Sequence, residues 1–63
     1  QERERVRQVL DTLPADYRAA VVLRYWYDLS YEEIAEAMDT TESAIKSRLH
    51  RARRMMAGQL EAA

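Results

Sequence analysis

The chain has 63 residues, a formal net charge of −1, and 48% hydrophobic against 33% charged residues. This composition is typical of one small globular domain with a thin core rather than of a disordered segment. The sequence has no cysteine, which excludes disulfides and thiol catalysis, and no apolar run of about 20 residues, which excludes a membrane-spanning helix. Its single histidine leaves almost nothing for general acid–base catalysis at neutral pH. We therefore expect a protein that is not an enzyme and that uses no cofactor or metal.

The net charge conceals an uneven distribution of charge along the chain. Residues 1–43 carry five arginines against ten acidic residues, whereas residues 44–63 carry one lysine and four arginines against a single glutamate. A basic C-terminal quarter on an acidic body indicates one element that faces a polyanion. A solvated basic helix without a ligand has the same composition, so only the spacing of the basic residues can distinguish the two.

One proline, one glycine and few β-branched residues at period-two spacing predict an all-α fold. The first helix is expected over residues 2–12. Its apolar residues recur on one face and are Val6, Val9, Leu10 and Leu13. Pro14 cannot continue this helix, but it suits the first turn of a second helix because its missing N–H is not needed there.

The second helix is expected over residues 15–27, and it ends in the run Tyr25-Trp26-Tyr27. Consecutive residues lie about 100° apart on a helix, so three aromatic rings cannot share one face. We expect one or two of these rings in the core and at least one at the surface. An exposed ring there would either contact a partner protein or be an ordinary half-buried side chain.

Ser30 and Glu33 fit the S-x-x-E capping box and predict a short third helix that begins at Tyr31 and ends at Asp39. The residues expected to face inward are Ile34, Ala35 and Met38. The three glutamates of this helix have no other reactive group near them in sequence. We therefore interpret them as a solvated face rather than as a catalytic carboxylate cluster.

Thr41 is the expected N-cap of a fourth helix that continues to about Leu60. Its core-facing stripe consists of Ile45, Leu49, Ala52 and Met56. The opposite arc carries polar and mostly basic residues, namely Lys46, Ser47, His50, Arg51, Arg53 and Arg54. Arg48 lies at the edge of the stripe, where its stem can pack while its guanidinium reaches solvent or a phosphate.

The third and fourth helices have the layout of a helix-turn-helix over about residues 31–54. Ala35 provides the small side chain that two steeply crossing helices need, and the second helix is left free to enter a DNA major groove. The residues expected to face base edges are Lys46, Ser47, His50 and Arg51. Those expected to meet phosphates are Arg48, Arg53, Arg54 and, at the helix N-terminus, Thr41 and Ser43.

Five blocks of sequence spread over roughly residues 6–57 form a specific pattern. They are Leu13-Pro14, Tyr17-Arg18, Leu23-Arg24-Tyr25, the run LSYEEIAEA from Leu29 to Ala37, and the run IKSRLHRAR from Ile45 to Arg53. Together they resemble region 4 of bacterial sigma factors, and most of all that of the extracytoplasmic-function group.

The resemblance implies a small four-helix domain, without a wing, that recognises the −35 promoter element and docks on the flap of the RNA polymerase β subunit. By matching positions it places Lys46, Ser47, His50 and Arg51 at the bases and Arg48 near the DNA backbone. The exposed members of one set are candidates for the flap-binding surface: Val21, Val22, Tyr25 and Trp26. We also expect a monomer in the bacterial cytoplasm, with no membrane partner, that an anti-sigma protein can cover.

Two positions depart from the family pattern, because glycine is common in the family where this chain has Asp28 and Asp39. Both follow a helix, where a left-handed residue is favoured, and aspartate tolerates that conformation better than most non-glycine residues. The promoter-melting domain of the family is absent, and the chain does not begin with Met. We therefore expect residues 1–63 to be one domain excised from a longer protein, able to bind but unable to initiate transcription alone.

Two other interpretations remain open. The basic helix could dock on an acidic protein partner, which would not require base specificity. The chain could instead be the helix-turn-helix of another regulator, such as the output domain of a two-component response regulator. That group shares the Ile-Ala turn and the lysine of the recognition helix, but it usually lacks the Leu13-Pro14 and Tyr17-Arg18 blocks.

Overall fold

Four helices make up the fold in the computed structural model, which describes residues 2–62 and, among them, the side chains of residues 4–59. In chain order they are α1 (Glu2–Asp11), α2 (Ala15–Tyr25), α3 (Tyr31–Ala37) and α4 (Glu42–Ala62). The described part of the chain contains no strand. The prediction of a small all-α domain with four helices is confirmed.

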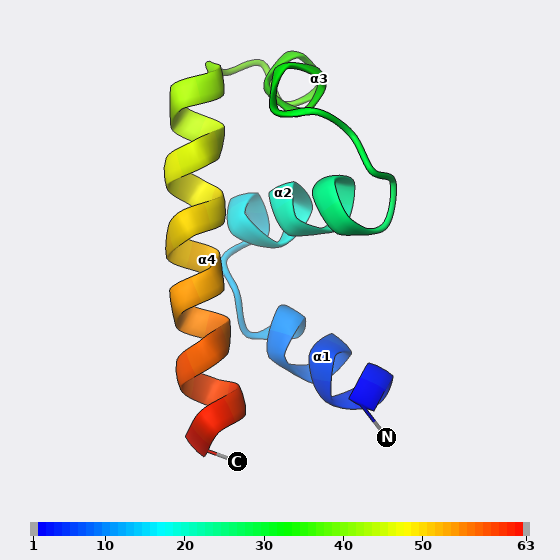
Figure 1. Ribbon diagram of the computed structural model, residues 1–63, viewed down its shortest axis with the longest axis vertical. Coiled ribbons are helices and arrows are strands. Elements are labelled where there is room, and N and C mark those ends of the chain that lie inside the picture. The colour runs from blue at the N-terminus through cyan, green and yellow to red at the C-terminus, as the bar shows by residue number, and fades with distance from the viewer. Residues whose placement is uncertain (1, 63) are drawn as a thin grey trace.

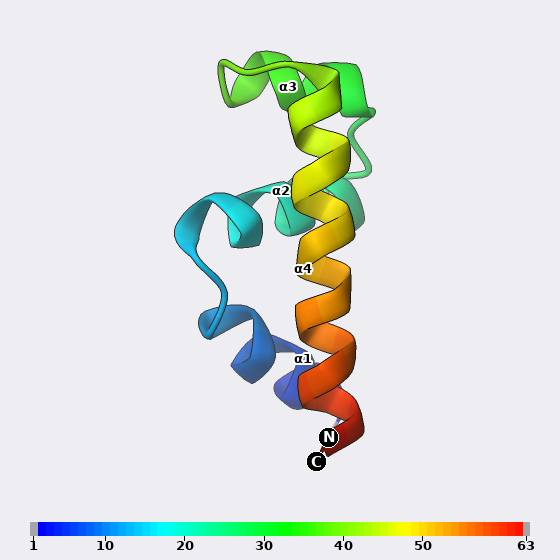
Figure 2. The same cartoon turned by 90° about the vertical axis from the view of Figure 1, so that its left-hand side faces the viewer.

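The helix α4 is the longest element, and the other three pack along one side of it. Figure 1 shows α3, α2 and α1 stacked in that order from the N-terminal to the C-terminal end of α4. A helix of 21 residues at about 1.5 Å per residue spans most of the 34 Å long axis of the domain. In Figure 2, α4 stands in front of the three shorter helices, so one of its faces is uncovered along its length.

The core lies between α4 and this stack of shorter helices. Its buried residues are Leu10, Leu13, Ala20, Val21, Ile34, Ala35, Ile45, Leu49 and Ala52. Ile34 of α3 and Ile45 of α4 are the largest fully buried side chains. Each contributes about 1.5–3 kcal/mol of hydrophobic stabilisation, so the pair holds the two helices of the helix-turn-helix together.

Side-chain caps fix where α3 and α4 begin. The Ser30 hydroxyl accepts a 3.0 Å hydrogen bond from the Glu33 N–H, and the Glu33 carboxylate accepts a 2.8 Å bond from the Ser30 N–H. This is the complete capping box that the sequence predicts. At the start of α4, the Thr41 hydroxyl accepts a 3.1 Å bond from the Ala44 N–H, which confirms Thr41 as the N-cap.

A left-handed aspartate ends α3 and begins the turn to α4. Asp39 has φ 55° and Asp28, after α2, has φ 54°, as the comparison with glycine at these positions predicts. The Thr40 N–H bonds the Ala35 carbonyl at 2.9 Å, and the Asp39 N–H bonds the Glu36 carbonyl at 3.3 Å. These two bonds form a Schellman motif, which satisfies the last carbonyls of α3 and sets the direction in which α4 leaves.

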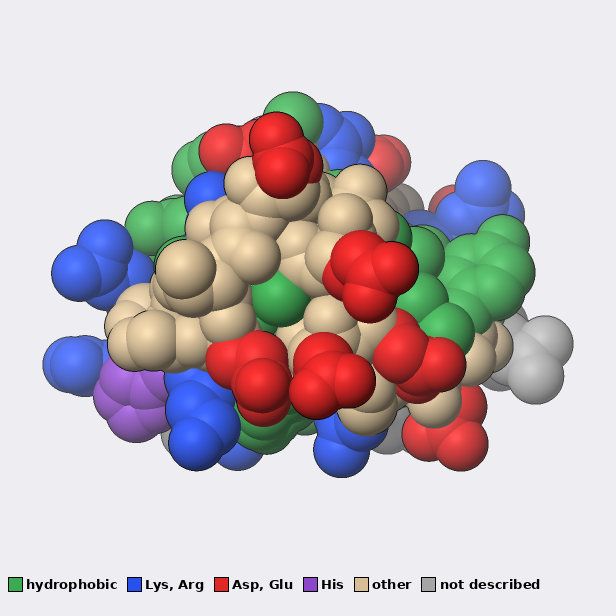
Figure 3. Space-filling view, turned by 90° about the horizontal axis from the view of Figure 1, so that it is seen from above, with side chains coloured by type: hydrophobic (Ala, Val, Ile, Leu, Met, Phe, Trp, Pro, Cys, Tyr) green, Lys and Arg blue, Asp and Glu red, His purple; other side chains and the backbone are tan. Residues whose placement is uncertain are grey.

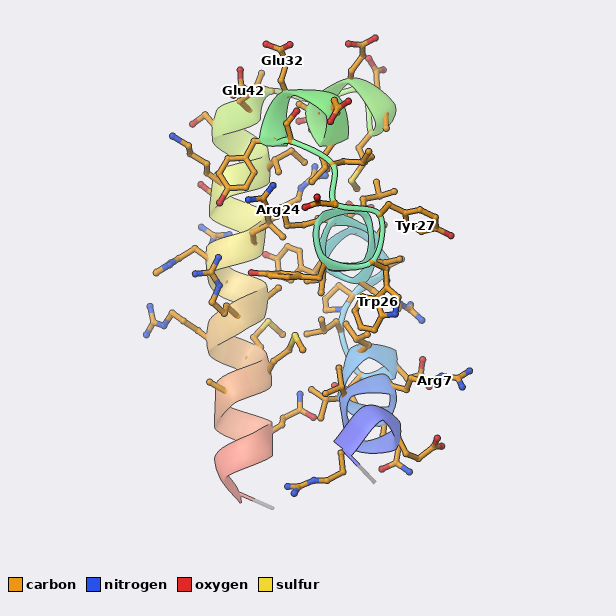
Figure 4. All side chains as sticks on the ribbon, turned by 45° about the vertical axis from the view of Figure 1, so that its right-hand side comes forward. Arg7, Arg24, Trp26, Tyr27, Glu32 and Glu42 are labelled. Carbon is orange, nitrogen blue, oxygen red and sulfur yellow. The ribbon has the colours of Figure 1, made fainter. Side chains whose placement is uncertain are left out.

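The end of α2 differs from the prediction. The helix ends at Tyr25, two residues early, and the chain then turns at Asp28. All three aromatic rings are exposed, Tyr25 by 58%, Trp26 by 57% and Tyr27 by 67%. The expectation of one or two of them in the core is therefore wrong. Tyr25 is exposed although it lies within α2, and so are Trp26, which caps the helix, and Tyr27, which follows it. Figure 4 shows Trp26 and Tyr27 projecting away from α4.

The other end of the domain is closed by a contact between α4 and Thr12, the residue that follows α1. The Gln59 side-chain amide donates a 2.8 Å hydrogen bond to the Thr12 hydroxyl. α4 passes through Gly58 without a break and continues to Ala62, two residues beyond the expected end. The long helix is therefore supported by another element near each of its ends.

Candidate nucleic-acid interface

The uncovered face of α4 carries the basic residues of the C-terminal quarter. Its exposed polar residues are Lys46, Ser47, His50, Arg51, Arg53 and Arg54, whereas Arg48 is half-buried at the edge. Seen from above in Figure 3, basic side chains and the histidine project on the α4 side of the molecule. The whole set predicted from the helical spacing therefore lies on one face.

Buried residues on the opposite side anchor this face to the domain. Ile45, Leu49 and Ala52 are at most 2% exposed and alternate along α4 with the basic positions. The N-terminal turns of α4 pack against α3, whose Ala35 is also buried. A rigid helix with an uncovered N-terminal half is the geometry that inserts into a major groove.

Acidic side chains surround the N-terminus of α4. Glu42 lies in the first turn of α4, and Figure 4 shows Glu32 of α3 projecting at the same end of the molecule. Thr41 and Ser43, which we expect to meet phosphate, are exposed there. The Thr41 hydroxyl already accepts the capping bond, but its proton remains available for a phosphate oxygen.

Arg51 lies on the side of the basic face nearest to α2, where it borders Tyr17. The nearby hydroxyl of Tyr17 in α2 raises the pKa of the exposed Arg51 guanidinium. The same two residues line a shallow hollow with Arg54 and Met55. The sequence analysis did not predict that Tyr17 borders the basic face at Arg51. The available signal was that a half-buried tyrosine needs a partner for its hydroxyl.

Arg24 also makes contacts between helices, but these contacts hold α2 against α3 and are not part of the basic face. Its guanidinium donates a 2.9 Å hydrogen bond to the Leu29 carbonyl and lies 5.0 Å from the centroid of the Tyr31 ring. Arg24 therefore ties the end of α2 to the start of α3. Helical spacing gives no indication of this role, because it depends on how the two helices dock.

The second predicted surface lies at the junction of α1 and α2. A groove there is lined by Arg7, Leu10, Asp11, Arg18, Val22, Trp26 and Tyr27. Tyr25 and Trp26 are exposed and Val22 is partly so, whereas Val21 is 3% exposed. Val21 faces the core and must be removed from the set of surface candidates for the polymerase flap.

A short capped helix, a left-handed turn and a long helix with an uncovered basic face define a helix-turn-helix domain of the DNA-binding type. In agreement with this class, residues 3–56 match the family model for region 4 of sigma-70. The chain belongs to this sigma-70 region 4 family.

Similar proteins are sigma factors, several of the extracytoplasmic-function (ECF) group. The chain is 40% identical over 55 residues to the RNA polymerase sigma factor SigV of Bacillus subtilis, covering 87% of the chain and 33% of that protein. It is 43% identical to the ECF RNA polymerase sigma-E factor of Haemophilus influenzae, covering 95% of the chain and 32% of that protein. For the ECF sigma-E factor of Escherichia coli K12, the identity is 45% over 81% of the chain and 27% of that protein. The chain thus spans about a third of the length of these relatives.

No helix in the described residues is long and apolar enough to cross a membrane. Within the same residues, no group of three or more His, Cys, Asp or Glu side chains is arranged to hold a metal ion.

Proposed function

We propose that this domain recognises the −35 element of bacterial promoters and directs RNA polymerase to them, as region 4 of an ECF sigma factor. The observation that carries the proposal is the uncovered basic face of α4, anchored on a helix-turn-helix core in a chain of the sigma-70 region 4 family. The domain has no catalytic role in this proposal: it binds, and the polymerase performs the chemistry.

The residues of α4 divide into two groups by their place on the helix. Base edges are read by Lys46, Ser47, His50 and Arg51, which lie on the uncovered face toward the N-terminal half. Phosphates are met by Arg48, Arg53 and Arg54, and by Thr41 and Ser43 at the helix start. Lysine and arginine pair with the acceptors of guanine, which favours at least one G·C pair in the element.

A second surface is proposed to bind the flap of the polymerase β subunit. Val22, Tyr25 and Trp26 form it, and their exposed apolar area suits a protein partner. An anti-sigma protein that covers the domain would use part of this area or the basic face. Since promoter DNA is the ligand, we place the protein in the bacterial cytoplasm and treat the chain as one domain of a longer sigma factor.

The proposal is tested by selecting duplexes from a randomised pool with the 63-residue domain. We expect a single enriched motif, and loss of that enrichment with Arg51→Ala or Lys46→Ala. Arg7→Ala is the matched control, because it removes one arginine charge from α1, and Figure 4 shows this side chain pointing away from α4. Retention of DNA without any enriched motif would contradict promoter recognition and favour a basic helix that docks on an acidic partner.

A further inference from the structure

A shallow hollow lies where the first turn of α2 meets the uncovered face of α4. It is lined by Tyr17 of α2 and by Arg51, Arg54 and Met55 of α4. The three residues of α4 stand three and four positions apart, so they share one side of that helix. Both arginines are exposed. The hollow is therefore an edge of the basic face that a second helix completes.

The lining of this hollow is positively charged. It holds two arginines and, within the described part of the chain, no carboxylate, although the whole chain has a formal net charge of −1. Asp16 precedes Tyr17 in α2 but is not part of the lining. The groove between α1 and α2, in contrast, includes Asp11, and a hollow at the start of α3 includes Glu32 and Glu42. An anion is therefore favoured here over those two places.

Tyr17 supplies a polar group at a fixed place in the hollow. Its side chain is half-buried and packs against the core cluster. A tyrosine in such a position keeps its ring among apolar side chains and its hydroxyl toward solvent. A side chain packed against a core has few rotamers, so the hydroxyl needs little further ordering when a ligand binds. Because a phenol hydroxyl can donate a hydrogen bond, it can hold an anionic oxygen.

The anion that fits this place is a phosphate of the DNA backbone. A helix in the major groove has the sugar–phosphate strands along its flanks and base edges beneath its uncovered face. The hollow lies on a flank, between α4 and α2, rather than at the middle of that face. Met55 is 40% exposed and gives the hollow an apolar side for the adjoining sugar. Tyrosine hydroxyls and arginines are usual donors to phosphate oxygens.

We propose that a backbone phosphate of the promoter occupies this hollow and accepts a hydrogen bond from the Tyr17 hydroxyl. Arg54 supplies the charged donor, in keeping with its assignment to phosphates. Arg51 keeps its assignment to a base edge and adds its positive charge beside the hollow. This inference rests on the DNA binding in the proposed function, and it adds a DNA contact on α2, outside the helix-turn-helix.

The experiment compares Tyr17→Phe with the unsubstituted domain on the selected duplex and on single base-pair variants of it. Phenylalanine keeps the ring that packs on the core and removes only the hydroxyl. Tyr27→Phe is the matched control, because Tyr27 is exposed and projects away from α4. Arg54→Ala and the double variant test whether both residues act at one phosphate. Selected duplexes that each carry one methylphosphonate then locate that phosphate, since this group has a methyl in place of one anionic oxygen.

We expect Tyr17→Phe to weaken binding about three- to tenfold, by the same factor for every base sequence, so that sequence preference is unchanged. The salt dependence should also be unchanged, because a hydroxyl releases no counterion, whereas Arg54→Ala should reduce the slope by about 0.9. In the Arg54→Ala background the loss from Tyr17→Phe should shrink. A methylphosphonate at one position should shrink the losses of both single variants. The melting temperature of Tyr17→Phe should stay within about 2 °C.

Different results would overturn the phosphate contact and the proposed function. Binding unchanged by Tyr17→Phe, or a loss that no methylphosphonate position reduces, would remove the phosphate contact while promoter recognition stood. A loss confined to one base pair would assign Tyr17 to sequence reading and also overturn the inference. Absence of any preference in the unsubstituted domain would contradict the proposed function, and the response of the affinity to Tyr17→Phe would still decide the phosphate contact.

Discussion

The guanidinium of Arg24 lies over the ring of Tyr31 at 5.0 Å from its centroid and donates a 2.9 Å hydrogen bond to the Leu29 carbonyl. Arg24 is half-buried at the last turn of α2, and Tyr31 is the first residue of α3. This side chain therefore links the last turn of α2 to the first residue of α3.

Arg24→Ala is expected to destabilise the domain by about 1–3 kcal/mol, because it removes a charge-assisted hydrogen bond and a cation–π contact. Thermal and urea unfolding followed by circular dichroism measure this change. Arg18→Ala is the matched control, since the Arg18 pair with Asp11 is 4.0 Å long and partly exposed, and such pairs contribute less than about 1 kcal/mol. Equal losses for the two variants would show that Arg24 is only a surface cation.

Asp39→Gly should leave the fold intact and raise the melting temperature by about 2–6 °C. At the φ of 55° that Asp39 adopts, a Cβ costs roughly 1–2 kcal/mol, and glycine removes this cost. Part of the gain is lost again, because glycine gives up more chain entropy than aspartate when the domain folds. Ala57→Gly is the control. Ala57 is exposed within α4, so glycine there should destabilise the folded domain by about 1 kcal/mol. A clear drop for Asp39→Gly would mean that the aspartate makes a contact worth more than its strain.

Ile45→Asp should unfold the domain. Ile45 is completely buried on the core-facing side of α4, and a carboxylate there would have no partner, at a cost of several kcal/mol. A domain of this size has only about 3–9 kcal/mol of stability in total. Lys46→Asp, one residue along on the exposed face, should keep the helical signal and the dispersed NMR spectrum while losing DNA. A folded Ile45→Asp variant would contradict the packing described for α3 and α4.

Base-reading and phosphate-binding residues should differ in how they respond to sequence. Arg51→Ala or Lys46→Ala should cost about 1–3 kcal/mol on the preferred duplex and relax preference at one position. Arg53→Ala should weaken binding to every duplex alike and make the salt dependence shallower. Fluorescence anisotropy with the preferred and altered duplexes measures both effects. Equal behaviour of the three variants would contradict the division of α4 into two groups.

Features set by local sequence could be predicted, and features set by helix docking could not. The capping box of Ser30 and Glu33, the Thr41 cap and the left-handed Asp39 depend on residues within a few positions of each other, so their chemistry is visible in the sequence. The stripe through Ile45 follows from the helical period in the same way. These elements define most of the helix-turn-helix.

The exposure of the aromatic residues at the end of α2 and the surroundings of Arg24 and Arg51 depend on where helices end and how they pack. The helical period alone predicts one or two of the three rings in the core, whereas all three are exposed because no other helix covers them. Tyr31, which Arg24 contacts, and Tyr17, which lines a hollow with Arg51, lie on different helices from these arginines. Periodicity identifies the basic face of α4, but it does not show which of its side chains are restrained.

The most direct test of sequence reading by α4 is a salt titration of two duplexes of equal length, one with the preferred motif and one with its bases scrambled. With the three arginines assigned to phosphates, the logarithm of affinity should fall with the logarithm of salt at a slope of roughly −2.7 for both. The preferred duplex should remain the tighter ligand throughout, because base contacts release few counterions. Identical affinities at every salt concentration would contradict sequence recognition by this domain.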